Sequence, residues 1–213
     1  IPRAIPERTW HRDGATTTLA FATLLRATRG VASEASYVGT PGIRFGPLVP
    51  DPKRLLDLPP GFSYRVVSRT GEAMSDGLLV PGAPDGMGAF AGPDGKTLVV
   101  RNHELGNDAP ELGPYGPSNE NLSRVPAADV YDAGSGSKPA LGGTTTFVWD
   151  TRTGNLERQF QSLAGTIRNC AGGPTPWGSW VSCEEATKDP ATGTAQPHGF
   201  NFEVPATYDV KHA

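Results

Sequence analysis

Glycine and proline occur throughout the chain, and their number constrains the fold more than any other feature. The 213 residues include 27 glycines and 21 prolines, more than a fifth of the chain and close to twice the usual share of each. Glycine weakens helix interiors through its backbone entropy, and proline through its missing N–H. Helical bundles, coiled coils and helical solenoids are therefore disfavoured. Because 37% of the residues are hydrophobic, the chain can still bury a core, and we expect a loop-rich all-β protein.

Charge and hydropathy argue against two classes of partner. The net charge is −3 and no long basic run occurs. Sequence-independent binding to nucleic acid requires a positively charged surface, so we expect no nucleic-acid partner. No run of 18 apolar residues occurs either, so we expect no membrane-spanning helix.

The N-terminal region differs in composition from the rest. Arg3, Arg8 and Arg12 precede a weakly apolar run at 15–25, and small residues follow it. A charged start, an apolar middle and a small-residue end are typical of an export leader. A short amphipathic helix packed on the domain is the alternative. We predict three parts: an export leader at 1–36, an extended segment rich in proline and glycine at 37–61, and a β domain at 62–213.

Short β-type runs bounded by turn residues recur in the β domain. They lie at 62–68, 97–102, 144–150, 156–162, 177–183 and 198–204. Asp94-Gly95 predicts a tight turn, and 150–154 predicts a hairpin loop. The stretch 105–143 is too long for a simple connection, so we expect a lid, a binding loop or a disordered insert there. Hairpins separated by Gly/Pro loops are typical of propellers and sandwiches.

Three polar clusters lie where predicted strands end, at 101–104 (RNHE), 168–173 (RNCAGG) and 183–185 (CEE). Histidine and glutamate together suit a metal site or acid–base chemistry, and a solvated strand end is the alternative. Adjacent carboxylates suit a hard cation such as calcium if the strand breaks there. Further acidic residues precede glycine and are interpreted as turn formers: Asp76, Asp85 and Asp94. His198 is interpreted as a core or strand-end histidine.

The two cysteines have two interpretations. Cys170 and Cys183 lie 13 residues apart, across a predicted turn, in a chain that has a leader-like start. A disulfide is the default for such a pair. Alternatively, Cys170 is a thiolate metal ligand and Cys183 a small buried side chain.

An ordered set of motifs resembles the PhoX-type bacterial alkaline phosphatases. The strings GFSYRVVSRTGEAMSDG, PDGMGAF, RNHE, NCAGGPTPWGSWVSCEE and HGFNFEV follow one another between residue 45 and about residue 205. The resemblance implies a six-bladed β-propeller, exported by the twin-arginine route, that hydrolyses phosphate monoesters with calcium and iron. A periplasmic or extracellular location follows from it.

The resemblance also implies roles for individual residues. Cys170 matches the iron-binding cysteine, and Glu104, Glu184 and Glu185 match acidic residues of the metal site. Asn102 and Asn169 are weaker candidates for positioning phosphate or a ligand. Carboxylates suit calcium and a thiolate suits iron, so the donor types agree with this assignment. The attacking atom is not assigned.

The length of the β domain departs from that family. A blade takes about 40 to 45 residues, so six need roughly 250, whereas 62–213 holds 152 residues. We therefore expect three to four blades, completed by a second chain or by a missing C-terminal half. Two alternatives to the phosphatase are a non-catalytic exported β domain with a Cys170–Cys183 disulfide, and a calcium-dependent propeller acting on sugars or lactones.

Overall fold

The computed structural model describes residues 45–134, 138–186 and 194–209. The predicted export leader at 1–36 lies outside these residues. The chain divides into two compact units, with a boundary between Val66 and Val67. The domain boundaries at 36/37 and 61/62 stay predictions. The described part of the first unit, 45–66, has no strand, and its backbone joins in a single bridge between Val49 and Leu58.

The second unit is all-β in its described part, as predicted. One sheet has the order β1-β2-β3-β4 and the other the order β5-β6-β7, with every neighbouring pair antiparallel. The strands are β1 (Pro84–Ala91), β2 (Lys96–His103), β3 (Gly142–Asp150), β4 (Asn155–Thr166), β5 (Asn169–Pro174), β6 (Ser179–Glu184) and β7 (Asn201–Pro205). Two successive meanders are compatible with propeller blades, while the number of blades and their completion by a further segment stay predictions.

Five of the six predicted strands are present, and one is wrong. The runs at 97–102, 144–150, 156–162, 177–183 and 198–204 correspond to β2, β3, β4, β6 and β7. The run at 62–68 is not a strand, because no described strand pairs with it. Both predicted turns are present: Asp94 and Gly95 adopt φ of 52° and 75° between β1 and β2, and the Gly154 N–H donates to the Asp150 carbonyl between β3 and β4.

The sequence missed β1 and β5, since both are rich in glycine. One glycine of each strand, Gly88 of β1 and Gly172 of β5, lies against the ring of Trp180 of β6. A Cβ on Gly88 of β1 would lie 2.7 Å from the Trp180 ring, and a Cβ on Gly172 of β5 would lie 2.7 Å from it as well. Glycine in a strand often marks such a close approach.

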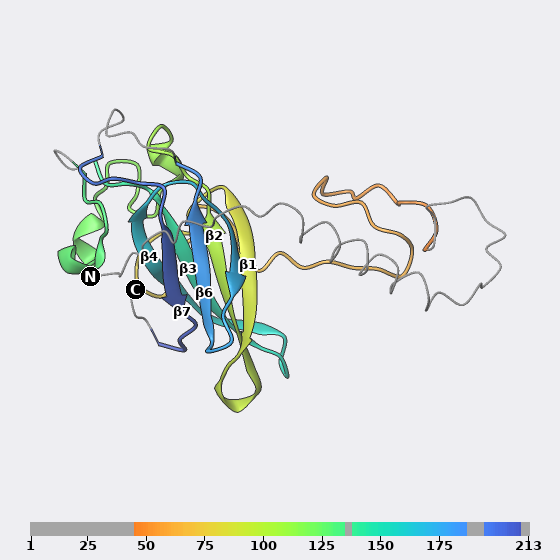
Figure 1. Ribbon diagram of the computed structural model, residues 1–213. Coiled ribbons are helices and arrows are strands. Elements are labelled where there is room, and N and C mark those ends of the chain that lie inside the picture. The colour runs from red at the N-terminus through yellow and green to blue at the C-terminus, as the bar shows by residue number, and fades with distance from the viewer. Residues whose placement is uncertain (1–44, 135–137, 187–193, 210–213) are drawn as a thin grey trace, which may run out of the picture. The chain divides into compact units, whose positions relative to one another are not determined.

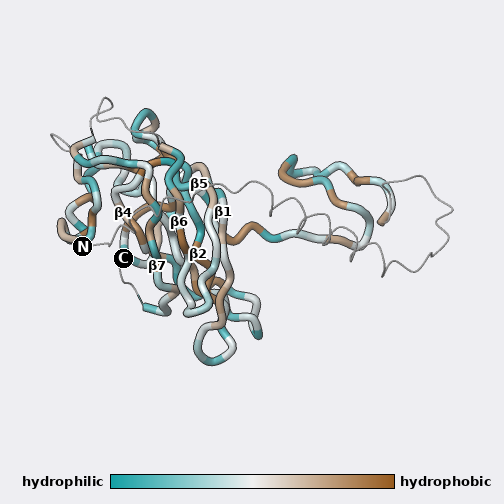
Figure 2. The backbone as a smooth tube through the Cα atoms, viewed as in Figure 1, coloured by the Kyte–Doolittle hydropathy of each residue, from teal (hydrophilic) through white to brown (hydrophobic). Residues whose placement is uncertain are grey.

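The core lies between the sheets (Figure 1), and hydrophobic residues of the second unit collect along the strands (Figure 2). Its two buried clusters consist of Val100, Leu163, Trp180, Phe202 and Val204, and of Leu98, Val148 and Phe160.

The long connection between β2 and β3 is packed against the domain rather than extended from it. Its described residues contain three short 3₁₀ helices: Pro110–Leu112, Leu122–Arg124 and Ala127–Asp129. Tyr115, Val125 and Val130 from this connection are buried with Met74 and Leu78 in a third cluster. The described residues contain no helix with the length and hydrophobicity needed to cross a bilayer.

Candidate metal centre

Two β-bulges lie at the ends of neighbouring strands and turn two side chains toward one point. The pairing of β1 with β2 shifts at Asp85 and Gly86, and the pairing of β5 with β6 shifts at Cys170 and Ala171. Bulges reorient side chains and are frequent beside active sites. Asp85 and Cys170 therefore leave the regular alternation of their strands.

Asn102 of β2 joins the two bulges. Its amide nitrogen donates to the carbonyls of Cys170 and Ala171, at 2.7 and 3.0 Å. Its oxygen accepts hydrogen bonds from Trp180 Nε1 and Ser182 Oγ, at 2.9 and 2.8 Å. The side chain is fully buried, and all these contacts are internal. Asn102 thus positions the Cys170 bulge, and its role in positioning phosphate or a ligand stays a prediction.

Gly86 allows the bulges to approach each other closely. A Cβ at this position would lie 2.7 Å from the Cys170 carbonyl oxygen, closer than side chains tolerate. The glycine after Asp85 therefore serves a backbone contact. The interpretation of Asp85 as a turn former is wrong, because Asp85 belongs to a strand bulge.

Asp85, Glu104 and Cys170 form the candidate metal site. Their ligand atoms all lie within 4.8 Å of one another, and all three residues are partly buried. Glu104 directly follows β2, and its N–H donates to the Ala83 carbonyl just before β1. Three strand ends thus converge, and they bring together two residues that the sequence assigned as ligands and one that it did not.

The ionisation of Cys170 shows the electrostatics of this site. A hydrogen bond to the Asp85 carboxylate, burial and the charge of Asp85, with a smaller effect of Glu185, raise the pKa of the thiol to about 12. No Lys, Arg or His of the described residues forms an ion pair with Asp85, Glu104 or Glu185. A bound cation would offset this negative charge and favour the thiolate.

Glu184 and Glu185 are separated by the end of β6. Glu185 is exposed, lies beside the Cys170 thiol, and its N–H donates to the Arg168 carbonyl. Glu184 is buried, and its carboxylate accepts hydrogen bonds from the N–H groups of Ile167, Gly199 and Phe200. The structure therefore brings Glu185 to the site and keeps Glu184 out of it.

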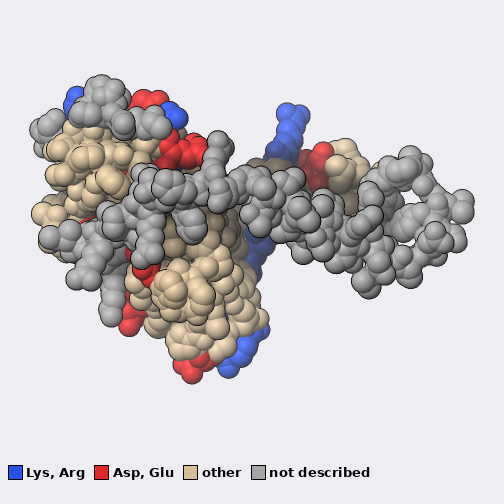
Figure 3. Space-filling view, in the orientation of Figure 1, with Lys and Arg blue, Asp and Glu red and all other residues tan. Residues whose placement is uncertain are grey.

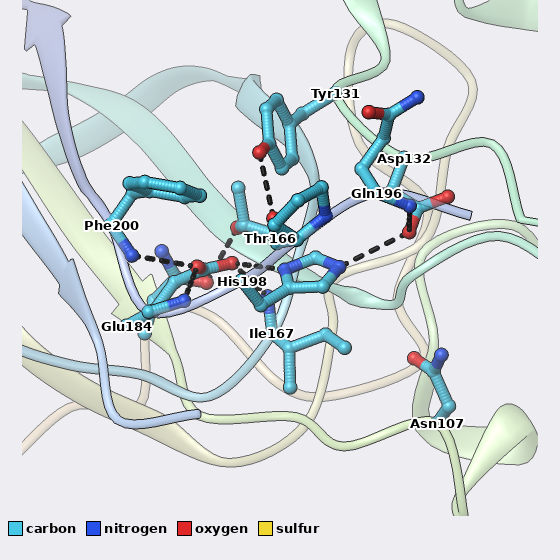
Figure 4. Close-up of polar contacts among 12 residues, drawn as sticks. Asn107, Tyr131, Asp132, Thr166, Ile167, Glu184, Gln196, His198 and Phe200 are labelled. Carbon is cyan, nitrogen blue, oxygen red and sulfur yellow. Dashed lines mark hydrogen bonds and ion pairs between the residues drawn. The ribbon is translucent and has the colours of Figure 1, made fainter. Parts of the chain in front are cut away.

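His198 forms a buried bridge between two carboxylates (Figure 4). Nδ1 lies 2.7 Å from Glu184 Oε1, and Nε2 lies 3.1 Å from Asp132 Oδ2. Burial favours the neutral ring, but hydrogen bonds and charge from Glu184, and then from Asp132, raise the pKa of His198 above its usual value. We call these three residues the His198 bridge. It agrees with the interpretation of His198 as a structural histidine.

The comparison with known families decides the relationship of this chain. The sequence profile of the family described as "Alkaline phosphatase PhoX" matches residues 43–158 and 148–211. The chain belongs to the PhoX alkaline phosphatase family. Comparisons with curated proteins and with solved structures found no match.

Two other polar residues of the PhoX motifs are structural. Asn169 is fully buried, with its amide nitrogen donating to Ser182 Oγ and its oxygen accepting from Thr166 Oγ1. His103 lies between the Gly82 carbonyl and Thr145 Oγ1, and burial, with the charge of Arg101, lowers its pKa to about 3. The structure brings neither side chain to the metal site.

Both cysteines are free in this PhoX family member. Cys183 lies opposite the Cys170 bulge but pairs with Asn201 of β7, on its other side. Burial raises the pKa of the Cys183 thiol. The disulfide interpretation is therefore not met, and Cys170 remains available as a ligand.

Proposed function

We propose that this chain hydrolyses phosphate monoesters with metal ions bound by Asp85, Glu104 and Cys170. One observation supports it most: a thiol and two carboxylates converge within 4.8 Å, and no described cation compensates them. Membership of the PhoX family supports phosphate monoester hydrolysis as the reaction.

The donor set fits the metals that the family resemblance implies. A thiolate is a soft ligand that suits iron, and Cys170 supplies one. Carboxylates suit calcium, and Asp85 and Glu104 supply them, with Glu185 as a fourth donor. Bound cations would provide the positive charge that phosphoryl transfer needs on the phosphate oxygens.

The protein's own contribution is to hold these donors in place. Asn102 fixes the Cys170 bulge through two carbonyl contacts, and Gly86 lets the Asp85 bulge lie against it. The Glu104 N–H is bonded to the start of β1. Ligands held by such second contacts need little reorganisation when a metal binds.

The proposal is tested by metal content and hydrolysis in two cysteine variants. We expect purified chain to contain calcium and iron and to hydrolyse p-nitrophenyl phosphate. Cys170→Ser should lose iron and reduce hydrolysis at least about 100-fold. Cys183→Ser is the matched control, since this thiol lies outside the site, and it should retain both. Wild-type chain without metal and without turnover would refute the proposal.

The alternative of a non-catalytic β domain includes a Cys170–Cys183 disulfide, whereas both thiols are free in the structure. Thiol titration in denaturant distinguishes the two functions. The phosphatase predicts two free thiols after metal removal, and the alternative predicts none.

We also propose export to the periplasm or beyond. The leader-like composition of 1–36 and the family membership support it. Fractionation of cells that express the full reading frame tests it. Activity confined to the cytoplasmic fraction would contradict export.

A further inference from the structure

A cavity of about 440 Å³ is lined by residues that lie close to Glu104 or Cys170 in the sequence. These residues are Gly106, Asn107, Asp108, Ile167 and Arg168. One wall, formed by 106–108, follows Glu104 in the sequence. The other wall, formed by 167–168, precedes Cys170, so each wall is connected to a candidate ligand. A hydrogen bond from the Arg168 N–H to the Leu105 carbonyl, 3.0 Å long, joins the two walls.

We propose that Arg168 and Asn107 form the phosphate-binding part of the active site, in this cavity. The inference rests on the proposed phosphatase function and adds the residues that recognise the substrate's phosphate group. Arg168 would supply a guanidinium that can bind two phosphate oxygens at once. Asn107 would supply an amide N–H.

The backbone of Arg168 is strained and is held in that strain. Its φ is 49°, in the left-handed region that side chains other than glycine and asparagine rarely adopt. The N–H of Ile167 donates to Glu184 Oε1, at 2.8 Å, and the Arg168 carbonyl accepts from the Glu185 N–H, at 3.0 Å. With the bond to Leu105, three contacts fix this conformation. Strain that the surrounding structure enforces in this way is typical of functional sites.

The His198 bridge makes one of these contacts rigid. Glu184, which accepts the Ile167 N–H, is itself held by the buried His198 ring (Figure 4). The side chain of Arg168 is exposed and forms no ion pair or hydrogen bond with the described residues. The protein thus fixes the backbone of Arg168 and leaves its guanidinium available.

Asn107 offers an unused donor. Its amide nitrogen is buried and has no hydrogen-bond partner among the described residues, while its oxygen accepts from the Leu141 N–H. A buried donor without a partner is costly, and a ligand oxygen would satisfy it. Asn107 lines the same cavity as Ile167, and both are labelled in Figure 4.

Asp108 is the one carboxylate among the residues that line the cavity, and its negative charge would repel a bound phosphate. Its Oδ1 lies 2.5 Å from the position that a Cβ on Gly106 would take, and Arg168 Nε lies 3.7 Å from that position. Asp108 and Arg168 nevertheless form no ion pair. Removing the Asp108 charge should therefore tighten phosphate binding.

The test measures binding of radiolabelled inorganic phosphate to the full chain, loaded with calcium and iron, by equilibrium dialysis. Arg168→Ala should weaken binding about 10- to 100-fold, because a charged hydrogen-bond donor is lost. The phosphate affinity of Arg168→Lys should lie between those of wild type and Arg168→Ala, since lysine keeps the positive charge but lacks the planar guanidinium. Asp108→Asn should tighten binding about two- to fivefold. Arg158→Ala is the control, because that guanidinium binds Asp209 and lies over the Tyr208 ring.

Arg168→Gly separates recognition from folding. Glycine adopts φ of 49° without strain, so this variant should melt at the wild-type temperature or a few degrees higher while its phosphate binding weakens as in Arg168→Ala. A purely structural role predicts unchanged phosphate binding in both variants.

Metal content, measured on every sample, keeps the two proposals apart. Wild-type metal content and wild-type phosphate affinity in Arg168→Ala would overturn the phosphate-binding role and leave the phosphatase standing. If wild-type chain binds no metal, the phosphatase proposal fails by itself. The same comparison without metal then decides on Arg168: weaker phosphate binding in the variant supports its role, and identical curves overturn it.

Discussion

Glu184 and Glu185 are consecutive residues with opposite environments. Glu184 lies inside the domain, where three backbone N–H groups and the His198 ring contact its carboxylate. Glu185 is exposed and lies beside the thiol of Cys170, whose pKa it helps to raise. Hydrogen-bond donors within the domain offset the negative charge of Glu184. The charge of Glu185 instead adds to that of Asp85 and Glu104, which no described cation offsets.

Compensation therefore separates structural acidic groups from candidate ligands in this molecule. Asp150 and Glu157 at the opposite end of β2 also have a cation, because Lys96 Nζ lies 3.1 and 2.7 Å from their oxygens. Charged side chains gather at the two ends of the sheets, as Figure 3 shows for one face. The group around Asp85 and Cys170, unlike the group around Lys96, has no described cation in ion-pair contact.

The largest effect is expected from removing the Glu184 charge. Glu184→Gln should lower the free energy of unfolding by about 3 to 5 kcal/mol, because the buried His198 bridge loses one of its carboxylates. Urea unfolding measures this loss. Glu185→Gln is the matched control and should stay within about 0.5 kcal/mol of wild type. Equal losses in both variants would remove the distinction between the two residues.

Asp85 should affect metal binding and leave stability nearly unchanged. Asp85→Asn should weaken metal affinity about 100-fold in titrations against a competing chelator, since one charged ligand is lost. Asp94→Asn, in the turn between β1 and β2, is the control and should bind metal as wild type does. Unchanged affinity in Asp85→Asn would exclude Asp85 from the site.

The thiol of Cys170 reports the charge of Glu185 directly. In metal-free Cys183→Ser chain, adding Glu185→Gln should speed alkylation by iodoacetamide at pH 8. The gain is about threefold per pKa unit, since the thiolate fraction rises tenfold while its nucleophilicity falls about threefold. An unchanged rate would show that Glu185 does not face the thiol.

The three Asp-Gly pairs show what the sequence could not predict. Asp76 accepts a hydrogen bond from the Leu78 N–H, and Asp94 adopts a left-handed turn conformation, so both form the predicted turns. Asp85 has the same local signal and lies in a bulge instead. The difference depends on the Cys170 carbonyl that approaches Gly86 from a strand 84 residues away in the chain. No local pattern contains that contact.

The sequence predicted the site residues that belong to family motifs. It could not predict which polar residues of those motifs are buried and hydrogen-bonded inside the domain. The motif resemblance named Glu104, Cys170 and Glu185, which the structure brings close together. It also named Asn102 and Glu184, whose polar atoms bind inside the domain. Short β-type runs bounded by turn residues predicted five of the described strands correctly, whereas β1 and β5 each contain a glycine that approaches Trp180.

The smallest effect concerns the compensated group at the other end of β2. The hydrogen bond from Lys96, followed by the Arg152 N–H, lowers the pKa of Asp150 from 3.8 to about 2. Asp150 therefore stabilises the fold above its unfolded pKa, and this contribution is lost as the pH falls through about 2. Acid unfolding of wild type and Asp150→Asn should differ by a constant amount above about pH 5 and converge near pH 2. If the difference in the free energy of unfolding between the two proteins grows on acidification, Lys96 does not offset the charge of Asp150. The presence of a compensating cation would then not distinguish structural carboxylates from metal ligands.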